Sequence, residues 1–182
     1  IMRISKIYLL VVVCFLASCN PLPRTKEQLI SYVNNKANGL LKYKETAEGQ
    51  FTLSYRAHAL LPGLPENAHL YWYFILSLSN QGREYSQNFL ATEEGYTNAI
   101  NKLAFGMSES TYAITNNLDT VYCSTSTFPR TYGSLDADKI LLVFKKEALG
   151  NAESFRMKIE AIRQEFEYRV NDILKIQDLK IK

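Results

Sequence analysis

Thiol and imidazole side chains are the first candidates for chemistry in this sequence. Cys123 lies in residues 121–124, where no histidine or cationic residue is present to lower the pKa of its thiol. His58 and His69 are the two histidines of the chain and are eleven residues apart, whereas a zinc site needs three or four clustered ligands. We therefore predict that Cys123 is a small buried residue on a strand and that the chain has no metal site.

Acyl-transfer and calcium chemistry have equally little support. His58 lies with Ser54 on the polar face of a predicted strand, but the chain has no Gly-x-Ser-x-Gly nucleophile motif. Asp136 and Asp138 lack the further, regularly spaced oxygen ligands of a calcium loop. The sequence thus predicts neither an enzyme nor a cofactor. The alternative is a hydrolase or an inhibitor that acts on cell-wall or glycan substrates, which a cleft uniting a histidine, an acid and a serine would favour.

The clearest chemical signature lies in the first nineteen residues. A short basic segment, residues 2–6, precedes the apolar residues 7–17, a run too short to cross a hydrocarbon core of about 30 Å. Four residues that end this region resemble the lipobox of bacterial lipoproteins: Leu16, Ala17, Ser18 and Cys19. The resemblance implies that the thiol of Cys19 is lipidated and that residues 1–18 are a signal peptide cleaved before it. The alternative is an ordinary signal peptide whose cysteine is incidental.

Cleavage before Cys19 changes the composition of the chain. Loss of residues 1–18 leaves 164 of the 182 residues and lowers the formal net charge from +3 to +1. Cys14 is lost with the signal peptide, so Cys123 becomes the single thiol of the domain and no internal disulfide can form. The low charge and the absence of a basic cluster predict no binding of nucleic acid. The predicted partner is the membrane, because two or three acyl chains at about 0.8 kcal/mol per buried methylene give permanent attachment.

A short tether and a helix follow the cysteine. Residues 19–25 contain two prolines, which disfavour helix and lack a backbone donor. Thr25 and Gln28 fit a capping box, which predicts a helix over about residues 26–35. A second helical pattern, with acidic residues in its first turn, spans residues 92–106. Residues 26–182 are therefore expected to form one domain with an N-terminal helix and one inserted helix.

Most of the remaining chain alternates apolar and polar residues with the period of two that is typical of strands. Residues 70–79 are apolar on one face and aromatic on the other, so this strand is expected at the centre of a sheet. Residues 155–170 fit one helix or two strands, and charged residues at the intervening positions favour two strands. Other strands are predicted at residues 51–59, 85–90, 112–115, 120–128 and 140–144. The predicted fold is mainly β, a β-sandwich-like domain.

Tyrosines on the predicted strands are the remaining candidates for recognition. Tyrosine combines a large apolar area with a polar hydroxyl, which suits contacts with a glycan or a protein. The predicted binding face contains Tyr71, Tyr73, Tyr122 and Tyr132. The alternative is that these rings only pack in the core and between neighbouring strands.

Short motifs are spread over most of the mature chain: residues 32–34, 37–40, 103–107, 119–123, 132–133, 171–173 and 179–181. They resemble motifs of a group of uncharacterised envelope lipoproteins of Bacteroidota. The resemblance implies an envelope lipoprotein and supplies no activity. Surface display in that phylum is associated with acidic residues just after the lipidated cysteine, and residues 20–26 contain none. We therefore expect the periplasmic leaflet of the outer membrane, and a non-catalytic binding or assembly module, such as an accessory of a secretion or transport complex, with an envelope protein as partner.

Overall fold

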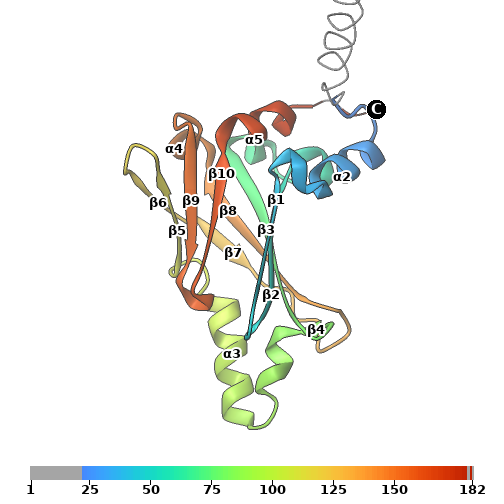
Figure 1. The fold of residues 1–182 in the computed structure, drawn as a ribbon, viewed down its shortest axis with the longest axis vertical. Coiled ribbons are helices and arrows are strands. Elements are labelled where there is room, and N and C mark those ends of the chain that lie inside the picture. Colours follow the sequence, from blue (N-terminus) through green and yellow to red (C-terminus); the bar gives the residue numbers. More distant parts are fainter. Residues whose placement is uncertain (1–21, 180, 182) are drawn as a thin grey trace, which may run out of the picture.

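Two antiparallel sheets form the body of the domain (Figure 1). The structure is a computed structural model that describes residues 22–179 and residue 181. The predicted signal peptide, its lipobox and Cys19 lie outside the described residues. The two sheets enclose one main hydrophobic core, so the predicted fold class, mainly β and sandwich-like, is confirmed.

The first sheet has the strand order β1-β2-β3-β8-β7, and the short strand β4 also pairs with β3. Its strands are β1 (Leu41–Thr46), β2 (Gly49–Arg56), β3 (Tyr71–Asn80), β4 (Arg83–Glu84), β7 (Thr125–Thr127) and β8 (Asp138–Lys145). The second sheet has the order β10-β9-β5-β6. Its strands are β5 (Thr111–Thr115), β6 (Thr120–Tyr122), β9 (Ser154–Ile159) and β10 (Gln164–Arg169). The central position predicted for residues 70–79 is confirmed, because β3 lies between β2 and β8.

Helices lie at both ends of the long axis of the domain (Figure 1). The α-helices are α2 (Lys26–Asn34), α3 (Glu93–Phe105), α4 (Lys146–Gly150) and α5 (Val170–Gln177). The short 3₁₀ helices are η1 (Lys36–Asn38), η2 (His58–Leu60), η3 (Glu66–Leu70), η4 (Tyr85–Phe89) and η5 (Glu160–Ile162). α2 and α5 are at one end, and α3 with η4 is at the other. The helices predicted over residues 26–35 and 92–106 are both confirmed.

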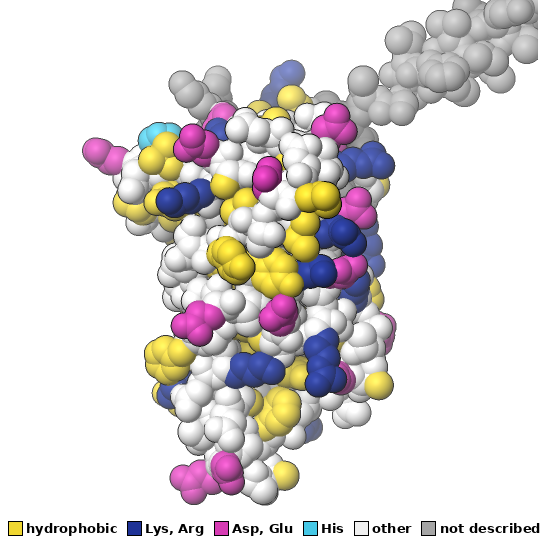
Figure 2. All heavy atoms as spheres, turned by 90° about the vertical axis from the view of Figure 1, so that its left-hand side faces the viewer, with side chains coloured by type: hydrophobic (Ala, Val, Ile, Leu, Met, Phe, Trp, Pro, Cys, Tyr) yellow, Lys and Arg dark blue, Asp and Glu magenta, His cyan; other side chains and the backbone are white. Residues whose placement is uncertain are grey.

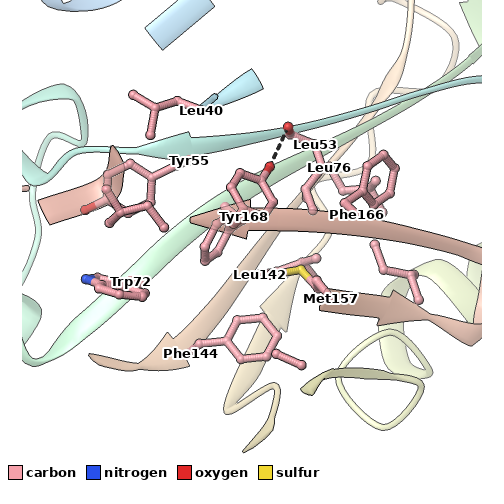
Figure 3. Close-up of a cluster of buried hydrophobic side chains, with 14 of the residues drawn as sticks. Leu40, Leu53, Tyr55, Trp72, Leu76, Leu142, Phe144, Met157, Phe166 and Tyr168 are labelled. Atoms are coloured by element: carbon pink, nitrogen blue, oxygen red, sulfur yellow. Dashed lines mark hydrogen bonds between the residues drawn. The ribbon is translucent and has the colours of Figure 1, made fainter. Parts of the chain in front are cut away.

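Aromatic side chains from both sheets meet in the core. Phe74 is fully buried, and four aromatic rings have centroids 5.3–6.1 Å from its own. They belong to Tyr55, Phe144, Phe155 and Tyr168. The hydroxyl of Tyr168, in the second sheet, donates a hydrogen bond of 2.7 Å to the carbonyl oxygen of Leu53 in the first sheet (Figure 3). Complete burial of Tyr168 raises the pKa of its hydroxyl, so the donor stays protonated and links the two sheets.

Several local features differ from the sequence predictions. The strand predicted at residues 85–90 is wrong, since this segment forms η4. Its Ser86 N–H donates to a carboxylate oxygen of Asp138 at 2.7 Å instead of pairing with a neighbouring strand. The segment 120–128 forms two strands in different sheets, because the chain passes from the second sheet to the first at Cys123. The sequence prediction did not include strand β1 or the helices α4 and α5. The strand predicted at residues 51–59 ends at Arg56, and His58 lies in η2.

Candidate binding site

The four tyrosines of the predicted binding face lie on different surfaces. Tyr71 and Tyr73 are together on the outer face of the first sheet. Ala68 and neighbouring leucines cover Tyr73, which is 5% exposed, and burial raises the pKa of its hydroxyl. Tyr122 is exposed in β6 of the second sheet, and Tyr132 is exposed in the loop before β8. The structure therefore brings together Tyr71 and Tyr73 and places the other two rings elsewhere.

Tyr122 forms a cross-strand pair with Tyr112 on the outer face of the second sheet. The two residues are opposite one another in β6 and β5, and their ring centroids are 5.9 Å apart. The hydroxyl of Tyr112 donates to the carboxylate of Glu160 at 2.9 Å, and this hydrogen bond raises the pKa of Tyr112. Lys158 is the partner of Tyr112 in the adjacent strand β9. Hydrophobic, basic and acidic side chains are interspersed on this side of the molecule (Figure 2), so the face carries no block of one charge.

A groove between α3 and η4 is a hollow with mostly apolar lining. Its volume is about 310 Å³. Its lining includes Tyr85 and Phe89 from η4 and Asn98, Ala99, Lys102 and Leu103 from α3. We call this feature the α3–η4 groove. Apolar lining with a few polar groups at the margin is the usual character of a surface that binds an apolar group.

The local sequence explains how the groove forms. The hydroxyl of Thr92 accepts a hydrogen bond of 3.0 Å from the Gly95 N–H and so caps α3. A Cβ atom on Gly95 would lie 2.8 Å from that hydroxyl and 3.3 Å from the carbonyl oxygen of Phe89, so only glycine allows this close approach of α3 to η4. Gly95, Ala99 and Lys102 form one stripe along the helix with spacings of four and three. The two small residues of this stripe, Gly95 and Ala99, are the sequence signal that could have indicated the groove.

The thiol of Cys123 is buried and contacts backbone carbonyl oxygens. Cys123 is 8% exposed, and burial raises the pKa of its thiol, which points to the carbonyl oxygens of Thr125 and Val143. The buried position predicted for Cys123 is confirmed, although the residue lies between strands β6 and β7 and not within one.

The side chains of His58 and His69 each contact a nearby backbone oxygen. The Nε2 atom of His58 is 3.0 Å from the carbonyl oxygen of Tyr71. The Nδ1 atom of His69 is 2.9 Å from the carbonyl oxygen of Glu66. Among residues 22–179 no three acidic, histidine or cysteine side chains lie close enough to hold a metal ion.

Two buried carboxylates fasten the loop that precedes β8. Glu84 is 2% exposed and accepts hydrogen bonds from the hydroxyl of Thr131 and from the N–H groups of Gly133 and Leu135. Asp138 is 1% exposed and accepts from the N–H and the hydroxyl of Ser86. Burial, together with the negative charge of Glu84, raises the pKa of Asp138 above its usual value. The carboxyl of Asp138 therefore links η4, and with it one wall of the groove, to β8.

The raised pKa of Asp138 predicts a dependence of stability on pH. A carboxyl whose pKa is higher in the folded state binds its proton more tightly there, so its contribution to folding grows as the pH falls from neutral toward 3.8, the ordinary pKa of an aspartate carboxyl. We expect the difference between the free energies of unfolding of the wild-type protein and of Asp138→Asn to increase as the pH falls through this range. Urea denaturation of both proteins at several pH values measures the difference. A constant or decreasing difference would contradict the assignment, and Asp136→Asn controls for an exposed carboxyl in the same loop.

Comparisons with known proteins give no match: no family model, no curated protein and no solved structure is similar to this chain. Within the part of the chain that the structure describes, no helix is long and apolar enough to cross a membrane.

Proposed function

We propose that the chain is a lipid-anchored lipoprotein of the cell envelope that acts as a non-catalytic binding or assembly module. The lipobox, with Cys19 as the lipidated residue, supports the anchor. The observation that best supports a binding or assembly role is the position of two features along the longest axis of the domain (Figure 1). Helix α2, which follows Cys19 closely in sequence, is at one end, and the α3–η4 groove is at the other. A domain anchored near α2 would present the groove away from the membrane.

The proposed partner is an envelope protein that inserts an apolar side chain into the α3–η4 groove. The groove is large enough for one such side chain, and two large apolar residues of the elements that form it are exposed: Leu90, directly after η4, to 59% and Phe105, the last residue of α3, to 71%. Exposed apolar residues on the elements that form an apolar hollow are typical of sites for protein association. The ammonium group of Lys102 at the margin would favour a partner with an acidic residue next to its apolar anchor.

The proposed location is the outer membrane, with the domain facing the periplasm. The absence of acidic residues from positions 20–26 supports this leaflet through the resemblance to Bacteroidota lipoproteins. An accessory role in a secretion or transport complex would use both features, because the lipid fixes the subunit in the membrane and the distal groove remains free for another subunit.

Affinity isolation from membranes, with the lipid intact and in mild detergent, tests the proposed role of the groove. Ala99 is half-buried in the groove wall, so Ala99→Arg should fill the groove and abolish recovery of a stoichiometric partner. Ala59→Arg is the matched control, because Ala59 is exposed in η2 at the opposite end of the domain. The proposal predicts a partner that is lost with the first variant and retained with the second. Recovery of the protein alone, or of the same partner with both variants, would contradict it.

A further inference from the structure

The chain becomes fixed to the domain very soon after Cys19. Pro23 is buried, the N–H of Arg24 donates to the Gln28 side-chain oxygen at 2.8 Å, and Thr25 caps α2. The apolar face of α2 then packs into the core through two fully buried residues, Leu29 and Val33. No flexible linker separates residue 23 from the body of the domain.

Covalent geometry limits how far this end of the domain can lie from a lipid on Cys19. Two residues lie between Cys19 and Leu22, and the three Cα–Cα steps of a fully extended chain span at most about 11 Å. The headgroup layer on each side of a bilayer is about 5–8 Å thick, from the difference between its total and hydrocarbon thickness. A lipidated Cys19 at the membrane interface therefore holds Leu22 within or directly next to the headgroups.

The surface beside Leu22 is a hollow with polar and cationic groups. Its volume is about 520 Å³, and Leu22, Arg24, Gln28, Ser31 and Tyr32 contribute to its lining. We call it the α2 hollow. Arg24 is exposed, and among the described residues its guanidinium forms no ion pair. Leu22 is 48% exposed, so an apolar side chain and a free cation lie next to each other at this end.

Helix α5 borders the same region and is held against η1, the short helix after α2. A Cβ atom on Gly39, whose φ is +73°, would lie 2.7 Å from the carboxylate of Asp172, so α5 approaches the chain there very closely. Lys175 of α5 forms an ion pair with Asp172, whose carboxylate accepts a hydrogen bond of 3.0 Å from the ammonium group. Two cations are therefore present at this end of the domain: Arg24, just before α2, and Lys175 of α5, which is paired with Asp172.

We infer that the α2 hollow lies on the membrane surface and accepts phospholipid headgroups of the leaflet that holds the acyl chains of Cys19. Arginine and lysine attract anionic headgroup phosphates, the hydroxyls of Ser31 and Tyr32 can donate hydrogen bonds to them, and an exposed leucine suits the boundary with the acyl chains. This inference rests on the proposed lipid anchor. It adds that the domain does not swing freely on its tether but lies with α2 against the bilayer.

Fluorescence quenching in vesicles tests this orientation. Ser31 is exposed in the α2 hollow, and Ser134 is exposed in the loop before β8, which is held to Glu84 of β4 and lies away from α2 (Figure 1). Ser31→Cys and Ser134→Cys are therefore matched sites for a fluorophore that reports polarity. The lipidated mature protein, residues 19–182, is reconstituted in phosphatidylethanolamine and phosphatidylglycerol vesicles that contain a lipid with a nitroxide near its headgroup. We expect a blue shift and loss of fluorescence for the label at residue 31, and neither change for the label at residue 134.

Two different failures can be told apart. Protein that does not float with the vesicles lacks the anchor, which would overturn the proposed function and with it the orientation. Protein that floats while both labels stay unquenched, or while residue 134 is quenched as strongly as residue 31, keeps the anchor and overturns only the orientation. The remaining thiol does not interfere, because Cys123 is buried.

Discussion

Replacing Cys19 with alanine is expected to abolish lipid attachment and to remove the protein from the outer-membrane fraction. The thiol is the group that the predicted lipobox presents for lipidation, and alanine has no atom that can replace it. The expected effect is all or none, because the buried methylenes of two or three acyl chains, at about 0.8 kcal/mol each, provide nearly all of the attachment. A mature net charge of +1 gives little additional attraction to the membrane.

Two measurements test this effect: incorporation of an alkyne-labelled fatty acid into the protein, and separation of the inner from the outer membrane to locate the protein. Cys14→Ala and Cys123→Ala are matched controls, since Cys14 lies in the apolar run of the predicted signal peptide and Cys123 is buried in the domain. Both controls should incorporate the label as wild type does. An unchanged label and unchanged fractionation in Cys19→Ala would show that this cysteine is incidental to the targeting sequence.

The second large effect is expected in the core. Phe74→Ala should lower the free energy of unfolding by about 3–5 kcal/mol, as is typical when a buried phenylalanine is truncated. Phe74 is fully buried, and its ring meets aromatic rings from β2, β8, β9 and β10. The cavity left by the substitution would therefore remove packing contacts with strands of both sheets. Because domains are commonly stable by only about 5–15 kcal/mol, this one change removes a large share of the total.

Urea denaturation followed by circular dichroism provides the measurement. Phe105→Ala is the matched control, since Phe105 is 71% exposed at the end of α3 and its truncation should change stability by less than about 0.5 kcal/mol. Similar losses for the two variants would mean that the aromatic cluster around Phe74 is not the centre of the core.

Alternation of apolar and polar residues was sufficient to predict most strands. The clearest case is residues 155–170, where Phe155, Met157 and Ile159 face the core while charged residues occupy the positions between them. The two-strand prediction is confirmed there despite residues that favour helix, because strand pairing with β5 and the shared core outweigh local propensity.

The incorrect predictions come from contacts between distant parts of the chain. Residues 85–90 contain strand-forming side chains, yet Asp138, 52 residues away from Ser86, supplies the hydrogen-bond acceptors that hold this segment as η4. The burial of Tyr73 depends on the segment between β2 and β3, and no spacing within β3 indicates which residues will cover it. The α3–η4 groove likewise depends on how two separate elements pack, although the small residues on α3 were visible in the sequence.

The mass of the intact protein extracted from membranes tests the lipid anchor most directly. The proposed function predicts a polypeptide of residues 19–182 that carries the added mass of a glyceride with two acyl chains on Cys19, with or without a third chain on its amino group. Proteolytic fragments should place all of this added mass on the peptide that begins with Cys19. A membrane-extracted polypeptide without added mass, whether or not it retains residues 1–18, would contradict the proposed anchor.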